Sequence, residues 1–168
     1  MPYEAWRPMN FGDEYERHWS RVDSTLDFRP GMSADVRPGI REPADSITFS
    51  LSPIFTGSAA AFAAGEAAVN AEVLRAFVAV FDPDQVLVAL DWQHEGYWFR
   101  PHIHASAAET WRVPPFPNGD YYLLFTDDLS VGTFGHPWEQ SICVVGARLV
   151  EELAPVLESW LPVLRRGR

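Results

Sequence analysis

The sequence contains no lysine, and all thirteen of its basic residues are arginine. Enzymes that hold a substrate or pyridoxal phosphate on a lysine Schiff base are therefore excluded, and so are nucleotide hydrolases that need a P-loop lysine. The single cysteine, Cys143, cannot form an intramolecular disulfide, and it cannot build a zinc or iron–sulfur site made of cysteines alone. These absences favour chemistry that uses neither a lysine nucleophile nor a thiolate cluster.

Long hydrophobic runs are also missing. The apolar stretches are as short as VLVAL at 86–90, so no segment is expected to span a membrane. The first fifteen residues lack the basic segment and apolar run of a signal peptide, and we therefore expect a cytoplasmic protein. The formal net charge of −10 predicts repulsion from nucleic acid and from anionic membranes, so neither is an expected partner.

The length and composition predict a single domain over residues 1–168, since 168 residues that are 47% hydrophobic can build one core. The spacing of apolar residues predicts a helix at 13–26 and a long helix that is capped by Ser58 and ends near Phe81. A C-terminal helix over 147–164 is expected to be interrupted by Pro155 and Pro162. We also expect a long loop at 28–45 and a disordered tail at 165–168.

The second half of the chain is rich in predicted strands. The continuous apolar run at 85–92 predicts a central strand covered on both faces. Few helices separate the strands, which predicts an α+β fold: a mainly antiparallel sheet of about five strands, with a long central helix and N- and C-terminal helices packed on it. The strands are expected at 46–51, 85–92, 97–104, 120–126 and 141–146, with a short additional one at 131–135.

One short pattern matches the first half of the cupin metal-binding motif. Two histidines on a strand, His102 and His104, would point to the same face, and Glu109 from the next strand would complete a metal face. The glycine expected after Glu109 is absent, and two long helices disagree with an all-β barrel. This metal site is therefore a minor alternative to exposed histidines at a strand end, and no cofactor is expected.

Three segments concentrate glycines, acids, histidines and aromatic residues: DWQHEGYW (91–98), PNGDYY (117–122) and GTFGHPWE (132–139). With the apolar strands that flank them, these segments resemble the bacterial domain-of-unknown-function family 2716. The resemblance covers residues from about 85 to 150, and FRPG at 28–31 matches more weakly. It implies membership of that family and carries no established activity.

The same three segments predict a functional pocket at one end of the sheet. Asp91 is expected to orient His94, and Asp120 or Glu139 is expected to pair with His136 in a rigid loop, so that the histidines can act as acids or bases near neutral pH. Aromatic walls with a few polar groups are usual in small-molecule sites. The expected ligand-binding residues are Trp92, Gln93, Tyr97, Tyr122, Phe134 and Trp138. The alternative for each residue is that it satisfies a turn or a buried ring N–H or O–H group.

We therefore expect a small-molecule-binding domain with scope for cofactor-independent acid–base catalysis, of the isomerase, cyclase, lyase or hydrolase type. An acidic protein-interaction module, for example an immunity-type protein that masks a basic toxin, stays open as a different class. A homodimer or another protein partner also stays open. A concave pocket holding both His94 and His136 would favour the first class, and a flat acidic patch with each histidine buried singly would favour the second.

Overall fold

A computed structural model describes residues 4–31 and 37–168 of the chain. Within these ranges eight strands form one sheet in the order β1-β4-β3-β5-β6-β7-β2-β8, and every neighbouring pair is antiparallel. The strands are β1 (Trp6–Pro8), β2 (Ser46–Ser50), β3 (Leu87–Asp91), β4 (Tyr97–Phe99), β5 (Tyr122–Phe125), β6 (Gly132–His136), β7 (Ser141–Val145) and β8 (Val163–Arg166). The predicted α+β class is confirmed, with more strands than the five expected.

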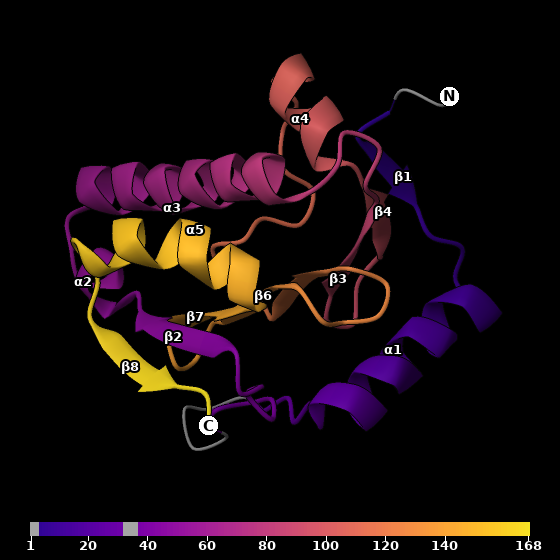
Figure 1. Cartoon of the computed structure of the whole chain (residues 1–168), viewed down its shortest axis with the longest axis horizontal. Helices are drawn as coiled ribbons and strands as arrows, with labels where there is room; N and C mark the ends of the chain where they lie inside the picture. Colours follow the sequence, from indigo (N-terminus) through magenta and orange to yellow (C-terminus); the bar gives the residue numbers. More distant parts are fainter. Residues whose placement is uncertain (1–3, 32–36) are drawn as a thin grey trace.

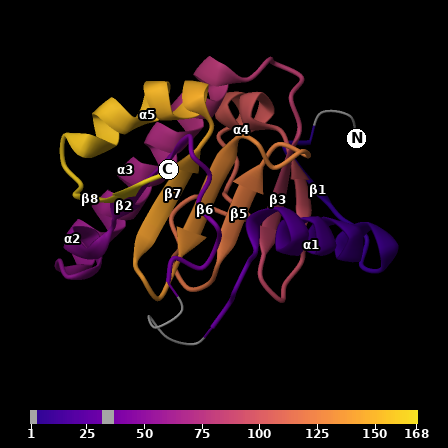
Figure 2. The ribbon, with the colours of Figure 1, turned by 60° about the horizontal axis from the view of Figure 1, so that its bottom comes forward.

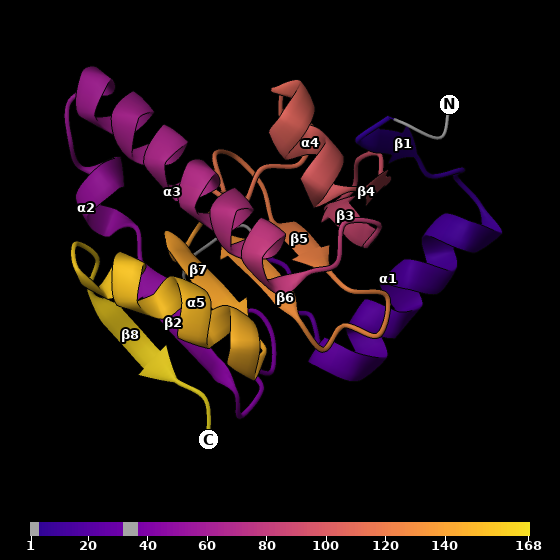
Figure 3. The same cartoon turned by 45° about the horizontal axis from the view of Figure 1, so that its top comes forward.

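Helices cover both faces of this sheet. The five helices of the described ranges are α1 (Asp13–Leu26), α2 (Ser52–Phe55), α3 (Ala59–Val80), α4 (Pro101–Ala107) and α5 (Ala147–Glu158). Helices α3 and α5 lie side by side over one face (Figures 1 and 3), whereas α1 crosses the other face (Figure 2). No helix of the described ranges is both long and apolar enough to cross a membrane.

Strand β3 shows why the apolar run at 85–92 is unbroken. Successive side chains of a strand point to opposite faces. Leu87 and Ala89 therefore join the core under α3 and α5, while Val88 and Leu90 join the core under α1. The prediction of a central strand covered on both faces is confirmed, and the strand ends at a polar residue, Asp91.

The predicted helices at 13–26 and 58–81 are confirmed as α1 and α3. The first turn of α1 carries Asp13, Glu14 and Glu16, which complement the positive end of the helix dipole. Ser58 caps α3, since its hydroxyl oxygen accepts a hydrogen bond from the backbone N–H of Ala61. Both boundaries follow from local capping and dipole effects that are visible in the sequence.

The predicted bounds of two elements are wrong. The strand expected at 97–104 ends at Phe99, because Pro101 opens helix α4, where its missing N–H costs nothing. The C-terminal helix ends at Glu158, and the residues expected to begin a disordered tail instead lie in β8, which pairs with β2. In the loop expected at 28–45, residues 28–31 and 37–45 form no helix or strand, and residues 32–36 lie outside the described ranges.

Candidate functional site

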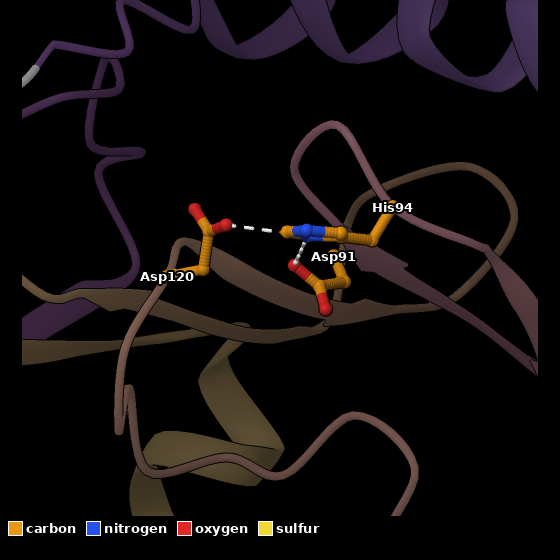
Figure 4. A group of neighbouring side chains, drawn as sticks. All are labelled: Asp91, His94 and Asp120. Carbon is orange, nitrogen blue, oxygen red and sulfur yellow. Dashed lines mark hydrogen bonds and ion pairs between the residues drawn. The ribbon is translucent and has the colours of Figure 1, made fainter.

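Asp91, His94 and Asp120 meet at one end of the sheet (Figure 4). Asp91 is the last residue of β3, and His94 lies in the turn that follows it. Asp120 precedes β5, which pairs antiparallel with β3 so that Asp91 faces Tyr122, and this register brings Asp120 alongside. The Nδ1 atom of His94 lies 2.9 Å from Oδ1 of Asp91 and 3.3 Å from Oδ2 of Asp120.

The turn that carries His94 is held from several sides. Gln93 has a φ of +67°, in the left-handed region, and the backbone N–H of His94 donates to the carbonyl oxygen of Asp91. The hydroxyl group of Tyr15 on α1 donates to the carbonyl oxygen of His94. Asp120 accepts the backbone N–H of Tyr121 through its Oδ1 atom, which leaves Oδ2 for the imidazole. The position of the histidine is therefore defined by both β3 and α1.

The electrostatics of this cluster favour a protonated imidazole. The hydrogen bond and the negative charge of Asp91 raise the pKa of His94, and the charge of Asp120 adds to this effect. Burial raises the pKa of Asp91, and its hydrogen bond to His94 partly offsets that rise. The His94 side chain is 63% exposed and therefore accessible to solvent, while the two carboxylates are about one-fifth exposed.

The raised pKa of Tyr122 reflects the negative charge beside the cluster. Burial raises the pKa of its phenol, and the charges of Asp91, Asp120 and Glu66 raise it further, to about 12. An imidazole and two carboxylates whose ligand atoms lie within 4.8 Å of one another are also of the types that hold a divalent cation. Because both carboxylates contact the Nδ1 atom of His94, such a cation would have to replace the proton on that atom.

His136 lies apart from this cluster in a fully buried environment. Its ring packs 4.9 Å from that of Tyr121, and its Nδ1 atom accepts the backbone N–H of Glu139. A Cβ atom on Gly39 would lie 2.9 Å from its Cδ2 atom, so the loop backbone closes over the imidazole. Of the two carboxylates expected to pair with His136, Asp120 pairs with His94. The Glu139 side chain accepts hydrogen bonds from Ser141 and Arg165, and the charge of His136 contributes only the last of the causes that lower the Glu139 pKa.

Glu139 belongs to an ion-pair network that fastens the C-terminal strand. Arg165 on β8 lies 2.7 Å from Oε1 of Glu139 and 2.6 Å from Oε1 of Glu42. Ser141 also donates to Glu139, and Thr48 donates to Glu42. Burial tends to raise the pKa of Glu139, but the hydrogen bonds from Arg165 and Ser141 outweigh it and lower the pKa. The structure therefore gives Glu139 a structural role.

The sheet separates the aromatic residues that were expected to share one pocket. Tyr97 and Tyr122 pack against the core under α3 and α5, whereas Trp92 and Phe134 belong to the core under α1. Trp138 is 44% exposed. A single pocket lined by all of these residues is therefore not formed.

Trp92 and Gln93 instead line a groove of about 540 Å³ beside α1. We call this the α1 groove. Its other aromatic walls come from Tyr15, Trp19 and Phe28, and the last two stack at 5.6 Å. Tyr15, Trp19 and Phe28 were not predicted as site residues, because the spacing of Tyr15 and Trp19 also suits an ordinary buried helix face. Tyr15 connects the α1 groove to the cluster through its hydrogen bond to His94.

The prediction of a cupin-like metal face is wrong. His102 and His104 lie on helix α4, where residues two positions apart point in different directions. His102 donates through Nε2 to the carbonyl oxygen of Phe81, and His104 accepts the indole N–H of Trp6 at Nδ1. Glu109 lies beyond the helix and is exposed.

A family model described as "Protein of unknown function (DUF2716)" matches residues 11–150. The chain belongs to the DUF2716 family. It is also 34% identical to "Uncharacterized protein YxiI" of Bacillus subtilis (strain 168) over 167 residues, which cover 97% of this chain and 98% of that relative. No solved structure matches the chain.

The segments by which this DUF2716 chain resembles its family take different roles in the structure. DWQH at 91–94 and GDYY at 119–122 supply the Asp91–His94–Asp120 cluster. GTFGHPWE at 132–139 supplies the buried His136 and the ion pair of Glu139 with Arg165. Two of the three segments therefore meet at the candidate site, and the third stabilises the fold behind it.

Proposed function

We propose that this chain binds a small molecule at the end of β3 and that His94 carries out acid–base chemistry on it. The observation that carries the proposal is the exposed imidazole of His94, whose Nδ1 atom is held by Asp91 and Asp120. A carboxylate in this position orients the ring and stabilises the imidazolium that forms when the histidine takes up a proton. His94 is then the acid–base residue, and Asp91 and Asp120 are positioning residues.

The α1 groove supplies contacts for the body of the ligand. Trp19, Phe28 and Trp92 offer aromatic surface, and Gln93 offers an amide for hydrogen bonding. Isomerisation, cyclisation, elimination and hydrolysis are the reaction types that such a site supports without a cofactor. The net charge of −10 favours a neutral or cationic ligand over an anionic one and argues against nucleic acid or anionic membranes as partners. We further propose a cytoplasmic location, with which the free, buried thiol of Cys143 is compatible.

An NMR fragment screen tests this proposal, with the histidine and tryptophan side chains of the whole chain isotope-labelled. We expect a subset of neutral and cationic fragments to shift the His94 and Trp92 signals together, because both residues border one binding region. His94→Gln should weaken these fragments, and its fold should be intact because the side chain is 63% exposed. Trp138→Phe is the matched control, since Trp138 is exposed and does not line the α1 groove.

Two results would count against the proposal. One is a screen in which no fragment moves the His94 and Trp92 signals. The other is a set of fragments whose binding is unchanged by His94→Gln.

An acidic protein-interaction module is the second candidate function, because His136 is buried and does not share a pocket with His94. This candidate needs surface charge and no shared histidine pocket. Helix α1, which crosses one face of the sheet (Figure 2), carries Asp13, Glu14 and Glu16 in its first turn. Its partner would be a basic protein, because a second copy of the chain carries the same net charge of −10 and is repelled. Sedimentation velocity of the chain mixed with a basic protein, measured at low and at high salt, distinguishes a charge-driven complex, which high salt dissociates, from a small-ligand site, which leaves the chain at one size.

A further inference from the structure

A separate cavity of about 400 Å³ lies between helices α3 and α4. None of its lining residues belongs to the Asp91–His94–Asp120 cluster or to the α1 groove. Alanine residues from both helices form much of its wall, so the space is left open by their small side chains. The groups with chemical character in the lining are Glu66, Asn70, His104, Glu109 and Trp111.

His104 lines this cavity and carries a hydrogen-bond donor that is not used in the described residues. Its side chain is only 3% exposed, and its Nδ1 atom accepts the indole N–H of Trp6 at 3.0 Å. A nitrogen that accepts a hydrogen bond carries no proton, so the proton of the neutral ring lies on Nε2. Burial lowers the pKa of His104, which keeps the ring neutral. In the described part of the chain no group accepts the Nε2 proton.

Asn70 also lines the cavity and carries a second donor of this kind. It is 8% exposed, and its Oδ1 atom accepts the backbone N–H of Phe116 at 2.9 Å. This bond fixes the orientation of the amide, so that its nitrogen is the group left for other partners. Among residues 4–31 and 37–168, nothing accepts a hydrogen bond from that nitrogen. Two nearly buried side chains of the cavity therefore hold unused donors.

Glu66 contributes negative charge that the described protein does not neutralise. One of its carboxylate oxygens, Oε2, is buried and has no hydrogen-bond partner in the described residues, and no ion pair there involves Glu66. Its charge also acts on Tyr122 and helps to raise the pKa of that phenol. An unpaired carboxylate at a partly buried position is costly, and a bound cation offsets that cost.

We propose that this cavity binds a small organic cation, an amidinium or a protonated amine on a planar ring that also carries a hydrogen-bond acceptor. The cationic group pairs with Glu66, the planar ring packs on Trp111, and the acceptor faces the donors of His104 and Asn70. Glu109 adds negative charge near the opening. This site is independent of the proposed function, since the two share no residue.

The test compares two probes of nearly the same shape, cationic 4-hydroxybenzamidine and neutral 4-hydroxybenzamide. Binding to the whole chain is followed by NMR, through the side-chain signals of Trp111 and His104. We expect the amidinium to bind at least about tenfold more tightly than the amide, because only the amidinium can pair with a carboxylate. Glu66→Gln should abolish this preference, whereas Glu72→Gln should preserve it, since Glu72 is on the same helix but pairs with Arg75.

A second variant guards against a folding defect in Glu66→Gln. Ala71→Leu places a larger side chain in the cavity wall at an exposed helix position, keeps Glu66, and should prevent both probes from binding. Equal affinity for the two probes would overturn the proposal. So would an unchanged preference in Glu66→Gln, or shifts at Trp92 and His94 in place of Trp111 and His104. The last result would also leave the proposed function standing, so the two proposals can fail separately.

Discussion

Arg165 near the C-terminus is expected to be one of the most sensitive charged residues of this protein. Replacing it by methionine keeps most of the side-chain length but removes the guanidinium that lies between Glu42 and Glu139. The side chain of Glu139 is 4% exposed and that of Glu42 is 11% exposed, so both carboxylates would be left with little solvent to stabilise them. Breaking a fully buried ion pair in this way costs about 3–5 kcal/mol.

The stability lost in Arg165→Met is expected to be somewhat smaller than that of a fully buried pair, because Arg165 itself is 34% exposed and solvent screens part of its interaction. We expect Arg165→Met to lower the free energy of unfolding by about 2–4 kcal/mol at neutral pH, which corresponds to a fall of about 4–16 °C in Tm for a domain of this size. Urea unfolding followed by tryptophan fluorescence measures the loss. Its m-value should be unchanged if the denatured state is unaffected.

The pH dependence gives an independent check of the cause. The pKa of Glu139 is lowered in the folded protein, so its contribution to stability is present above its unfolded pKa and is lost as the pH falls through the folded value. In Arg165→Met the largest effect that opposes the burial of the Glu139 carboxylate is lost and the hydrogen bond from Ser141 remains, so protonation of Glu139 relieves part of the cost of its burial. The difference in stability between wild type and variant should therefore narrow between pH 7 and about pH 4.

Arg166→Met is the matched control. Arg166 is 60% exposed and pairs with a partly exposed Glu158, so its loss should change stability by at most about 1 kcal/mol. A loss below about 1 kcal/mol in Arg165→Met, or a difference that widens on acidification, would refute the reasoning.

Two further predictions concern the cluster and the sheet. Asp91→Asn should lower the pKa of His94, because Asp91 is the main cause of its raised pKa, and an NMR titration of the imidazole measures the change. Asp127→Asn is the control. An unchanged His94 pKa in Asp91→Asn would contradict the assignment. Gly132→Ala should destabilise the chain by about 3 kcal/mol or more in urea unfolding, because the added Cβ would clash with the backbone carbonyl oxygen of Leu124. Gly119→Ala, where no atom lies within 4 Å, should change little by comparison, and equal losses at the two positions would show that crowding is not the cause.

Features that depend on neighbours along the chain could be predicted from the sequence. The bounds of α1, the Ser58 cap of α3 and the double-sided burial of β3 all follow from capping, dipole and periodicity effects over a few residues. The contact of Asp91 with His94 was predicted for the same reason, because the two residues are three positions apart at the end of a strand. Composition alone excluded lysine-dependent chemistry, and three short segments were enough to indicate the family.

Features that depend on contacts between distant segments were decided by the tertiary structure. Asp120 joins His94 only because β5 pairs with β3 in one register, while His136 is enclosed by a loop that approaches it from another part of the chain. Arg165 was expected in a disordered tail, because nothing near it in the sequence indicates that it pairs with two carboxylates. One of them, Glu42, is 123 residues away. His104 binds Trp6 across 98 residues, and that contact leaves its other nitrogen available to the cavity. Local patterns specify which elements form, whereas the pairing of strands and the packing of helices specify which polar groups meet, because both are set by burial summed over the whole chain.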